Sequence, residues 1–471
     1  MLIQKVMKLL FFVLLLLFNY GFSEPGVDIG YNLTMQVPDG HEMGFTGKAF
    51  FIDTKETEPH FRVALGVEEG INGKYSCSLE VFLGDVKVWD SGHYSKFYTS
   101  EKCFLELTKD GDLRLKGPKG IVGWKTGTSG QGVKSLQILS TGNLVLVDAM
   151  NNIKWQSFNF PTDVILRGQQ LDVATHLTSF RRNSTLFYSF EIENKKVSLY
   201  LNSDKLKYSY WEFQPSMNRS ISYVKLSSKG LVLFDVKYKK IAQILSQSIH
   251  PLKFLALKND TGNLGLYYYS PEIRKFDASF QALNNTCDLP IACKPYGVCT
   301  LSNTCSCIQL LTNENKNENK NSGDCGGEFS GGFCSGKEAE MLELDNVSSV
   351  LKDVRKMVNV SKETCANLCL QDCKCASAFY FQNQSADEAE CYLYRLVLGL
   401  KQVDKGTGFS YMVKVPKGSV RNHGKHNVKT WILVAVGVAD GIIVLLLFGL
   451  FGYWLIKRRS HTLHNSQART S

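Results

Sequence analysis

A short turn motif recurs three times along this chain of 471 residues. The three copies read Asp-Gly-Asp-Leu-Arg-Leu at 110–115, Thr-Gly-Asn-Leu-Val-Leu at 141–146 and Thr-Gly-Asn-Leu-Gly-Leu at 261–266. An alternating apolar pair precedes each copy: Leu105 and Leu107, Leu136 and Ile138, and Leu255 and Leu257. Apolar residues two apart share one face of a strand, and glycine supplies the positive φ of a tight turn, so each copy predicts a β-hairpin.

Each predicted hairpin has one apolar face that another element must cover. Spaced repeats of this kind close around a shared core, so they predict an all-β barrel or prism. The first two copies lie close together and predict one unit, whereas the third copy predicts a second unit. The chain is therefore expected to be mainly β.

A second motif carries a resemblance to a known family. Residues 155–163 read Trp-Gln-Ser-Phe-Asn-Phe-Pro-Thr-Asp, and Gly-Gln-Gln-Leu follows at 168–171. This combination resembles the signature of plant bulb-type (G-type) lectin domains in the S-locus glycoprotein and S-receptor family, and in particular its kinase-lacking, PAN domain-containing members. The resemblance implies a bulb-type lectin domain at 24–160, a second lectin-like, S-locus glycoprotein-like domain at 161–283, a small disulfide-rich EGF-like module at 284–328 and a PAN/apple α+β domain at 334–415.

The first 23 residues have the pattern of a secretory signal peptide. Lys5 and Lys8 precede an apolar run at 9–18, and small or polar residues follow around Gly21 and Ser23. The alternative is an uncleaved anchor, but ten apolar residues are too few for a bilayer that needs about 20. We expect a cleaved signal at 1–23.

A second apolar run, at 431–456, is long enough for a single transmembrane helix, and a basic triplet at 457–459 follows it. The signal peptide places the preceding residues outside the cytoplasm, which predicts a single-pass type I protein of the plasma membrane. The expected cytoplasmic tail, 457–471, is too short for a kinase, and the chain lacks kinase motifs. We expect no catalytic activity.

The predicted span contains polar and small residues that could bind another helix: Gly437, Asp440 and Gly441. A carboxylate in the bilayer core is costly unless it is paired or protonated, and Gly-x-x-x-Gly lets two helices approach closely. The alternative is that Asp440 is protonated or hydrated near the outer interface and that the glycines are ordinary. The first interpretation predicts association with another membrane protein, such as a receptor kinase.

The fourteen cysteines predict up to seven disulfides, because the secretory lumen is oxidising. Two stand alone in the large β domains: Cys77 and Cys103. Six fall in the EGF-like module: Cys287, Cys293, Cys299, Cys305, Cys307 and Cys325. Six fall at the PAN/apple domain: Cys334, Cys365, Cys369, Cys373, Cys375 and Cys391. Spacing alone does not determine the pairing.

One helix is predicted in the PAN/apple segment. Ser361 can cap a helix that runs through Cys369, which puts Cys365 and Cys369 on one face at i and i+4. Four nearby sulfurs could instead hold zinc. An oxidising lumen favours disulfides, so no metal or other cofactor is expected.

Eight Asn-x-Ser/Thr sequons predict N-glycosylation, and all of them lie between the signal and the predicted span. Their asparagines are Asn32, Asn183, Asn218, Asn259, Asn284, Asn346, Asn359 and Asn383. This distribution supports the predicted topology.

Mannose-binding bulb lectins use Gln-x-Asp-x-Asn-x-Val-x-Tyr, and here both copies in the first domain depart from it. The five positions hold Thr108, Asp110, Asp112, Arg114 and Lys116 in one copy and Leu139, Thr141, Asn143, Val145 and Val147 in the next. The polar residues Asp112 and Asn143 are then expected only to shape turns. We expect the fold to serve protein or peptide recognition.

The sequence gives little support for nucleic-acid binding or for an enzyme. The formal charge of +10 is spread over a secreted chain, so nucleic-acid binding is not expected. Neither a Gly-x-Ser-x-Gly elbow nor a His-Glu-x-x-His helix is present. The leading hypothesis is a receptor-like glycoprotein that binds an extracellular protein, peptide or glycan and acts as co-receptor or decoy. The alternative is an adhesion lectin that holds membrane to wall glycans without a signalling partner.

Overall fold

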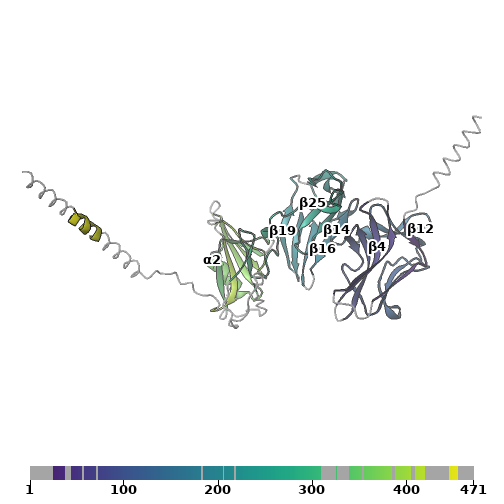
Figure 1. Ribbon diagram of the computed structural model, residues 1–471, viewed down its shortest axis with the longest axis horizontal. Helices are drawn as coiled ribbons and strands as arrows, with labels where there is room; N and C mark the ends of the chain where they lie inside the picture. Colours follow the sequence, from purple (N-terminus) through teal and green to yellow (C-terminus); the bar gives the residue numbers. More distant parts are fainter. Residues whose placement is uncertain are drawn as a thin grey trace, which may run out of the picture. The chain divides into compact units, whose positions relative to one another are not determined.

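The computed structural model is mainly β, as predicted (Figure 1). It describes residues 25–37, 44–55, 58–70, 73–181, 184–204, 206–216, 219–308, 325, 339–352, 355–383, 388–404, 409–418 and 445–454. The predicted signal peptide, the tail and most of the predicted span lie outside these ranges. Residues 445–454 are helical. No helix within the described ranges combines the length and apolar character that a membrane crossing requires.

The first lectin-like region consists of three antiparallel sheets. One has the order β1 (Gly26–Asp28), β11 (Val133–Ile138), β12 (Leu144–Asp148) and β13 (Ile153–Gln156). The second has the order β10 (Val122–Lys125), β9 (Leu113–Lys116), β8 (Lys102–Leu107) and β2 (Asn32–Gln36). The third joins β3 (Thr46–Asp53), β4 (Phe61–Glu69), β5 (Tyr75–Leu83) and β6 (Val86–Asp90), and β7 (Phe97–Thr99) pairs with β5.

Three tryptophans, one from each sheet, meet in this region. Trp89 of β6, Trp124 of β10 and Trp155 of β13 contact one another edge to face, with ring centroids 5.8–6.4 Å apart. The indole of Trp89 also donates a hydrogen bond to Phe160 O at 2.8 Å. Such aromatic pairs stabilise a core beyond their area burial, so the tryptophan of the Trp-Gln-Ser-Phe motif helps to join the three sheets.

The second lectin-like region repeats the three-sheet arrangement. Its sheets have the orders β14-β23-β24-β25, β15-β20-β21-β22 and β16-β17-β18-β19. The strands are β14 (Val164–Leu166), β15 (Gln170–Asp172), β16 (His176–Phe180), β17 (Leu186–Ile192), β18 (Val197–Ser203), β19 (Leu206–Phe213), β20 (Tyr223–Ser227), β21 (Gly230–Phe234), β22 (Lys240–Leu245), β23 (Leu252–Leu257), β24 (Leu264–Ser270) and β25 (Lys275–Gln281). Tyr188 and Phe190 are fully buried in it.

All three predicted hairpins are present: β8–β9, β11–β12 and β23–β24. Their turn glycines, Gly111, Gly142 and Gly262, have φ of 89°, 85° and 74°. An added Cβ would lie 2.8 Å from Val133 at Gly111, 2.4 Å from Phe61 at Gly142 and 2.6 Å from Tyr188 at Gly262. Glycine is therefore required for two reasons: the backbone is left-handed, and a neighbouring side chain covers the turn.

The EGF-like and PAN/apple segments, predicted as separate modules, share one sheet. Its order is β27 (Cys305–Cys307), β26 (Gly297–Cys299), β33 (Leu400–Gln402) and β29 (Val347–Ser349), and β26 pairs with β33 in parallel. Lys401 Nζ also lies 2.7 Å from Asp288 Oδ1. Three disulfides join Cys287 to Cys299, Cys293 to Cys305 and Cys307 to Cys325.

The remaining sheet of the PAN/apple segment packs against one helix. The sheet has the order β28 (Ala339–Asp345), β34 (Phe409–Pro416), β31 (Ser377–Asn383), β32 (Glu388–Tyr394) and β30 (Arg355–Val358), and the helix is α2 (Lys362–Gln371). Ser361 Oγ accepts a bond from Thr364 N at 3.1 Å, which is the predicted cap. At the other end, the buried Lys414 Nζ donates to the carbonyls of Cys369, Leu370 and Asp372. The serine cap at one end and the lysine charge at the other thus favour the helix.

Disulfides account for most of the remaining cysteines. Cys365 pairs with Cys391, Cys369 with Cys375, and Cys77 with Cys103. The buried sulfurs of Cys365 and Cys369 share one helix face, as predicted. The first two pairings use four sulfurs of the PAN/apple segment, so these four are disulfide-bonded and are not zinc ligands. Cys334 lies outside the described residues.

We expect Gly262→Ala to destabilise the second lectin-like region by about 3 kcal/mol. The energetic cost of alanine in a left-handed conformation adds to the cost of its overlap with Tyr188. Gly168→Ala is the matched control: its φ is 92°, but an added Cβ meets nothing within 4 Å. It should cost about 1 kcal/mol. Hydrogen exchange of β23 and β24 in the full chain measures both, and equal losses would contradict the packing argument.

Candidate functional site

The residue after each turn glycine is buried and holds the segment that follows its sheet. Asp112 is 1% exposed. Its Oδ1 accepts hydrogen bonds from Thr126 Oγ1 at 3.0 Å, Gly127 N at 2.8 Å and Thr128 N at 3.1 Å. Its Oδ2 accepts from Arg114 Nε at 2.8 Å. Burial raises the pKa of Asp112, but these donors together hold it below its ordinary value.

Asn143 does the same work in the second copy, and its partners are the residues of the Trp-Gln-Ser-Phe motif. Its Nδ2 donates to Gln156 Oε1 at 2.8 Å, and its Oδ1 accepts from Ser157 Oγ and Phe158 N, both at 3.2 Å. Asn143 is 5% exposed. Asp112 and Asn143 were predicted only to shape turns. Their side chains instead bond to residues 126–128 and 156–158, which also keeps their polar atoms occupied within the chain.

Other side chains of these two copies also bond or pack within the chain. Thr108 Oγ1 donates to Asp112 O at 3.0 Å, the carboxylate of Asp110 accepts from the Ser129 hydroxyl, and Lys116 pairs with Glu106. Val145 and Val147 are buried. Neither copy presents a row of open polar groups of the kind that a sugar requires.

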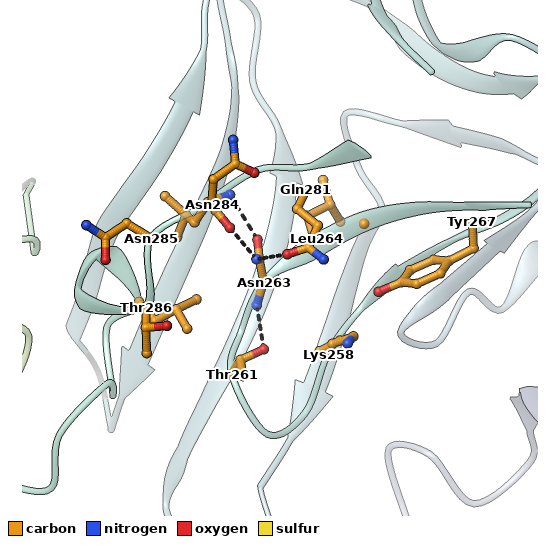
Figure 2. A pocket seen from close by; sticks show the side chains of 12 residues that line it. Lys258, Thr261, Asn263, Leu264, Tyr267, Gln281, Asn284, Asn285 and Thr286 are labelled. Carbon is orange, nitrogen blue, oxygen red and sulfur yellow. Dashed lines mark hydrogen bonds between the residues drawn. The ribbon is translucent and has the colours of Figure 1, made fainter. Parts of the chain in front are cut away.

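The third copy differs, because a cavity of about 120 Å³ lies beside it (Figure 2). Its lining comes from the hairpin turn, β24, the end of β25 and η3 (Thr286–Asp288). The lining residues are Lys258, Thr261, Asn263, Leu264, Gly265, Tyr267, Gln281, Leu283, Asn284, Asn285, Thr286 and Leu289. We call this cavity the Asn263 pocket.

Asn263 forms one wall of the pocket, and its side chain is held by three hydrogen bonds (Figure 2). Its Nδ2 donates to Gln281 Oε1 at 3.2 Å and to Leu283 O at 2.7 Å, and its Oδ1 accepts from Leu283 N at 3.1 Å. Gln281 thus takes the role that Gln156 has in the second copy. Asn263 builds the wall, and its backbone N also donates to Thr261 Oγ1 at 3.3 Å.

Tyr267 is the aromatic group of the Asn263 pocket. A Cβ on Gly265 would lie 2.7 Å from its ring, so the ring covers the backbone of Gly265. It stacks on Phe254 at 4.9 Å between centroids, and Lys258 Nζ lies 6.0 Å from its centre. Burial raises the pKa of Tyr267 above its ordinary value, so its hydroxyl is a neutral hydrogen-bond donor at physiological pH.

This pocket was not predicted, although the sequence contains a signal for it. The mannose spacing applied to the third copy gives Asn259, Thr261, Asn263, Gly265 and Tyr267, so both the asparagine and the tyrosine are retained. The first two copies retain neither the glutamine nor the tyrosine. Applying the same test to all three copies would have singled out the third.

The predicted glycosylation residues lie in several regions. Asn32, Asn259, Asn284 and Asn359 are exposed, and Asn346 is half-buried. Asn183 and Asn218 lie outside the described residues, and Asn383 ends β31. Asn284 lines the Asn263 pocket. The predicted helix-association residues Gly437, Asp440 and Gly441 also lie outside the described ranges.

A separate group of exposed aromatic side chains surrounds His93. Tyr94 is 56% exposed and Phe180 is 43% exposed. Their rings lie 4.8 Å and 5.3 Å from that of His93, between centroids. Exposed aromatic clusters are common centres of protein interfaces.

Part of the chain is similar to a known lectin family. Residues 88–185 match the model of the D-mannose binding lectin family. The match crosses the boundary predicted at residue 160.

Three plant relatives from Arabidopsis thaliana are similar over most of the chain. A PAN domain-containing protein is 24% identical over 75% of this chain and 72% of its own length. EP1-like glycoprotein 4 is 26% identical over 71% of this chain and 79% of its own length. The G-type lectin S-receptor-like serine/threonine-protein kinase SD2-5 is 24% identical over 77% of this chain, which spans 45% of that kinase.

These matches confirm the predicted resemblance to the plant bulb-type lectin, S-locus glycoprotein-like family. Among solved structures, a monomeric mannose-binding lectin from Gastrodia elata is 19% identical over 28% of this chain and 94% of its own. Its TM-score is 0.18.

We expect Asp112→Asn to lower stability by about 2 kcal/mol at pH 7, because the amide keeps one acceptor but turns a donor toward Arg114. The folded pKa of Asp112 is lowered, so its contribution is present above the unfolded pKa and is lost as pH falls through the folded value. The difference in free energy of unfolding between wild type and variant should therefore shrink below about pH 4.

The double variant Asp112→Asn with Arg114→Val removes the donor that the introduced amide would face, but Lys125 stands where the second copy has the acceptor Gln156. It should recover only part of the loss at pH 7. Thermal unfolding of the full chain from pH 7 to 2 measures both variants. A gap that does not change with pH would contradict the proposed role of the charge.

Proposed function

We propose that this chain is a receptor-like glycoprotein of the plant plasma membrane, anchored once as a type I protein, that binds an extracellular carbohydrate in the Asn263 pocket. The observation that carries the proposal is the contrast between the three turns. The first two copies are closed by internal hydrogen bonds, whereas the third has a cavity lined by polar and aromatic side chains. The family match at residues 88–185 lies outside this pocket, so the ligand class is proposed from Asn263 and Tyr267, which the third copy keeps at the mannose spacing.

The chemistry of the Asn263 pocket suits a sugar. Pockets that hold small polar ligands combine an apolar surface with a few fixed donors and acceptors. The Tyr267 ring supplies an apolar face for the C–H groups of a pyranose. Lys258, Thr261 and the amide nitrogen of Gln281 supply polar groups around it. Since Asn263 is fixed by its own bonds, the wall is preorganised, and little ordering cost falls on binding.

We expect Tyr267→Phe to weaken binding of a mannose-terminated oligosaccharide about 5-fold, since it removes one hydrogen bond worth about 1 kcal/mol. Tyr238→Phe is the matched control, because Tyr238 is 77% exposed and lies away from the pocket lining. Full-length protein in detergent, applied to the immobilised oligosaccharide, measures retention. Equal retention of both variants would contradict binding in this pocket.

The predicted span leads to a second part of the proposal, a signalling role. We propose that it acts as a co-receptor or decoy and that a partner kinase associates through Gly437, Asp440 and Gly441. Asp440→Leu should reduce co-purification of membrane kinases from plant cells, because it removes the carboxylate that a partner helix would bind. Ile442→Leu is the control within the same segment. Unchanged co-purification with Asp440→Leu would remove the support for this partner.

A second candidate function is protein recognition at the aromatic group around His93. The exposure of Tyr94 and Phe180 favours it. An adhesion role without a kinase is the further alternative. Retention on wall polysaccharide with no co-purified kinase would favour adhesion.

A further inference from the structure

Two sequons flank the Asn263 pocket. Asn284, Asn285 and Thr286 form one, and all three residues line the cavity (Figure 2). Asn259 begins the other, in the same turn as Lys258 and Thr261, which also line it. A glycan on Asn284 would therefore start at the rim of the pocket.

The backbone around Asn284 is held on both sides. Leu283, just before it, exchanges two hydrogen bonds with the Asn263 side chain, at 2.7 and 3.1 Å. Just after it, Asn285 Oδ1 accepts from Cys287 N at 2.9 Å, and Cys287 is tied to Cys299. Within the described residues the exposed Asn284 amide has no hydrogen-bond partner. Its position relative to the pocket is thus fixed while its amide stays accessible.

We propose that Asn284 carries an N-linked glycan whose innermost N-acetylglucosamine occupies the Asn263 pocket and limits the access of external sugars. In the modification, the Asn284 amide nitrogen bonds to the anomeric carbon of a lipid-pyrophosphate-linked oligosaccharide. The bond from that carbon to the phosphate oxygen breaks, the lipid pyrophosphate leaves, and the amide nitrogen loses one proton. The regulatory half of this proposal rests on the proposed carbohydrate-binding function.

Tethering favours this occupant over a free sugar. A group attached by a short linker has an effective concentration in the millimolar range without any new contact. A weak monosaccharide site is therefore filled by an attached sugar before a dilute external one. The Tyr267 ring offers the sugar a face, and Lys258 and Gln281 offer polar partners.

Asn32 supplies a matched comparison outside the pocket. It is exposed on β2, and its own Nδ2 donates to Gly30 O at 2.9 Å. It is absent from the pocket lining. A glycan on Asn32 should therefore remain in solvent and be fully accessible to enzymes.

The first experiment measures how fast a peptide N-glycosidase releases each glycan. Full-length protein is made in mammalian cells that produce only high-mannose glycans, and glycopeptides are followed by mass spectrometry. In the native protein, we expect release at Asn284 to be at least 10-fold slower than at Asn32. After denaturation the two rates should be equal. An unmodified Asn284, or equal native rates, would overturn the proposal.

A Tyr267→Ala variant separates a sugar in the pocket from simple crowding near Asn284. Loss of the ring should speed native release at Asn284 several-fold and leave Asn32 unchanged. Unchanged protection at Asn284 in this variant would also overturn the proposal, because the glycan would then be shielded by something other than the pocket.

The second experiment tests regulation with Thr286→Ala, which removes the sequon, and Thr286→Ser, which keeps it. Thr286→Ala should bind the mannose-terminated oligosaccharide several-fold more tightly than Thr286→Ser. Protection of Asn284 with no oligosaccharide binding by any variant would overturn the proposed function while leaving the occupied pocket intact. Equal binding by the two variants would overturn the regulation alone.

Discussion

A buried amide or carboxylate directly after a turn glycine fastens each of the three hairpins to the segment that leaves its sheet. Asp112, Asn143 and Asn263 all occupy this position, and all three bond to backbone groups 15 to 20 residues further along the chain. Buried polar groups need such partners, since an unpaired one costs about 1–3 kcal/mol. The glycine brings the turn close to its neighbours, and the polar side chain then fixes where the following segment runs.

This arrangement explains which features the sequence could predict. The hairpins depend on short-range patterns, namely alternating apolar residues and a turn glycine, and all three were predicted. The Trp-Gln-Ser-Phe motif was recognised by resemblance, and the structure supplies its physical reason. Trp155 meets the tryptophans of the other two sheets, while Gln156 and Ser157 bind Asn143.

Features that depend on long-range pairing were not predicted. The EGF-like and PAN/apple segments share a sheet because β26 pairs with β33, about a hundred residues later. No local periodicity records such a pairing, and cysteine spacing leaves the disulfide connectivity open. The Asn263 pocket was missed for a related reason: its wall joins a hairpin turn to the connection after β25, which only the folded chain brings together.

The residue two positions after each buried polar group decides what its face can do. Arg114 turns the first copy into an ion pair with Asp112, and the buried Val145 closes the second. Gly265 has no side chain in the third, and the Tyr267 ring moves over the strand into that space. Among the described residues, the three hairpins thus differ at this one position: an arginine, a buried valine, or a glycine that leaves room for an aromatic wall beside a cavity. One residue can therefore change what a hairpin presents while the hairpin itself is kept.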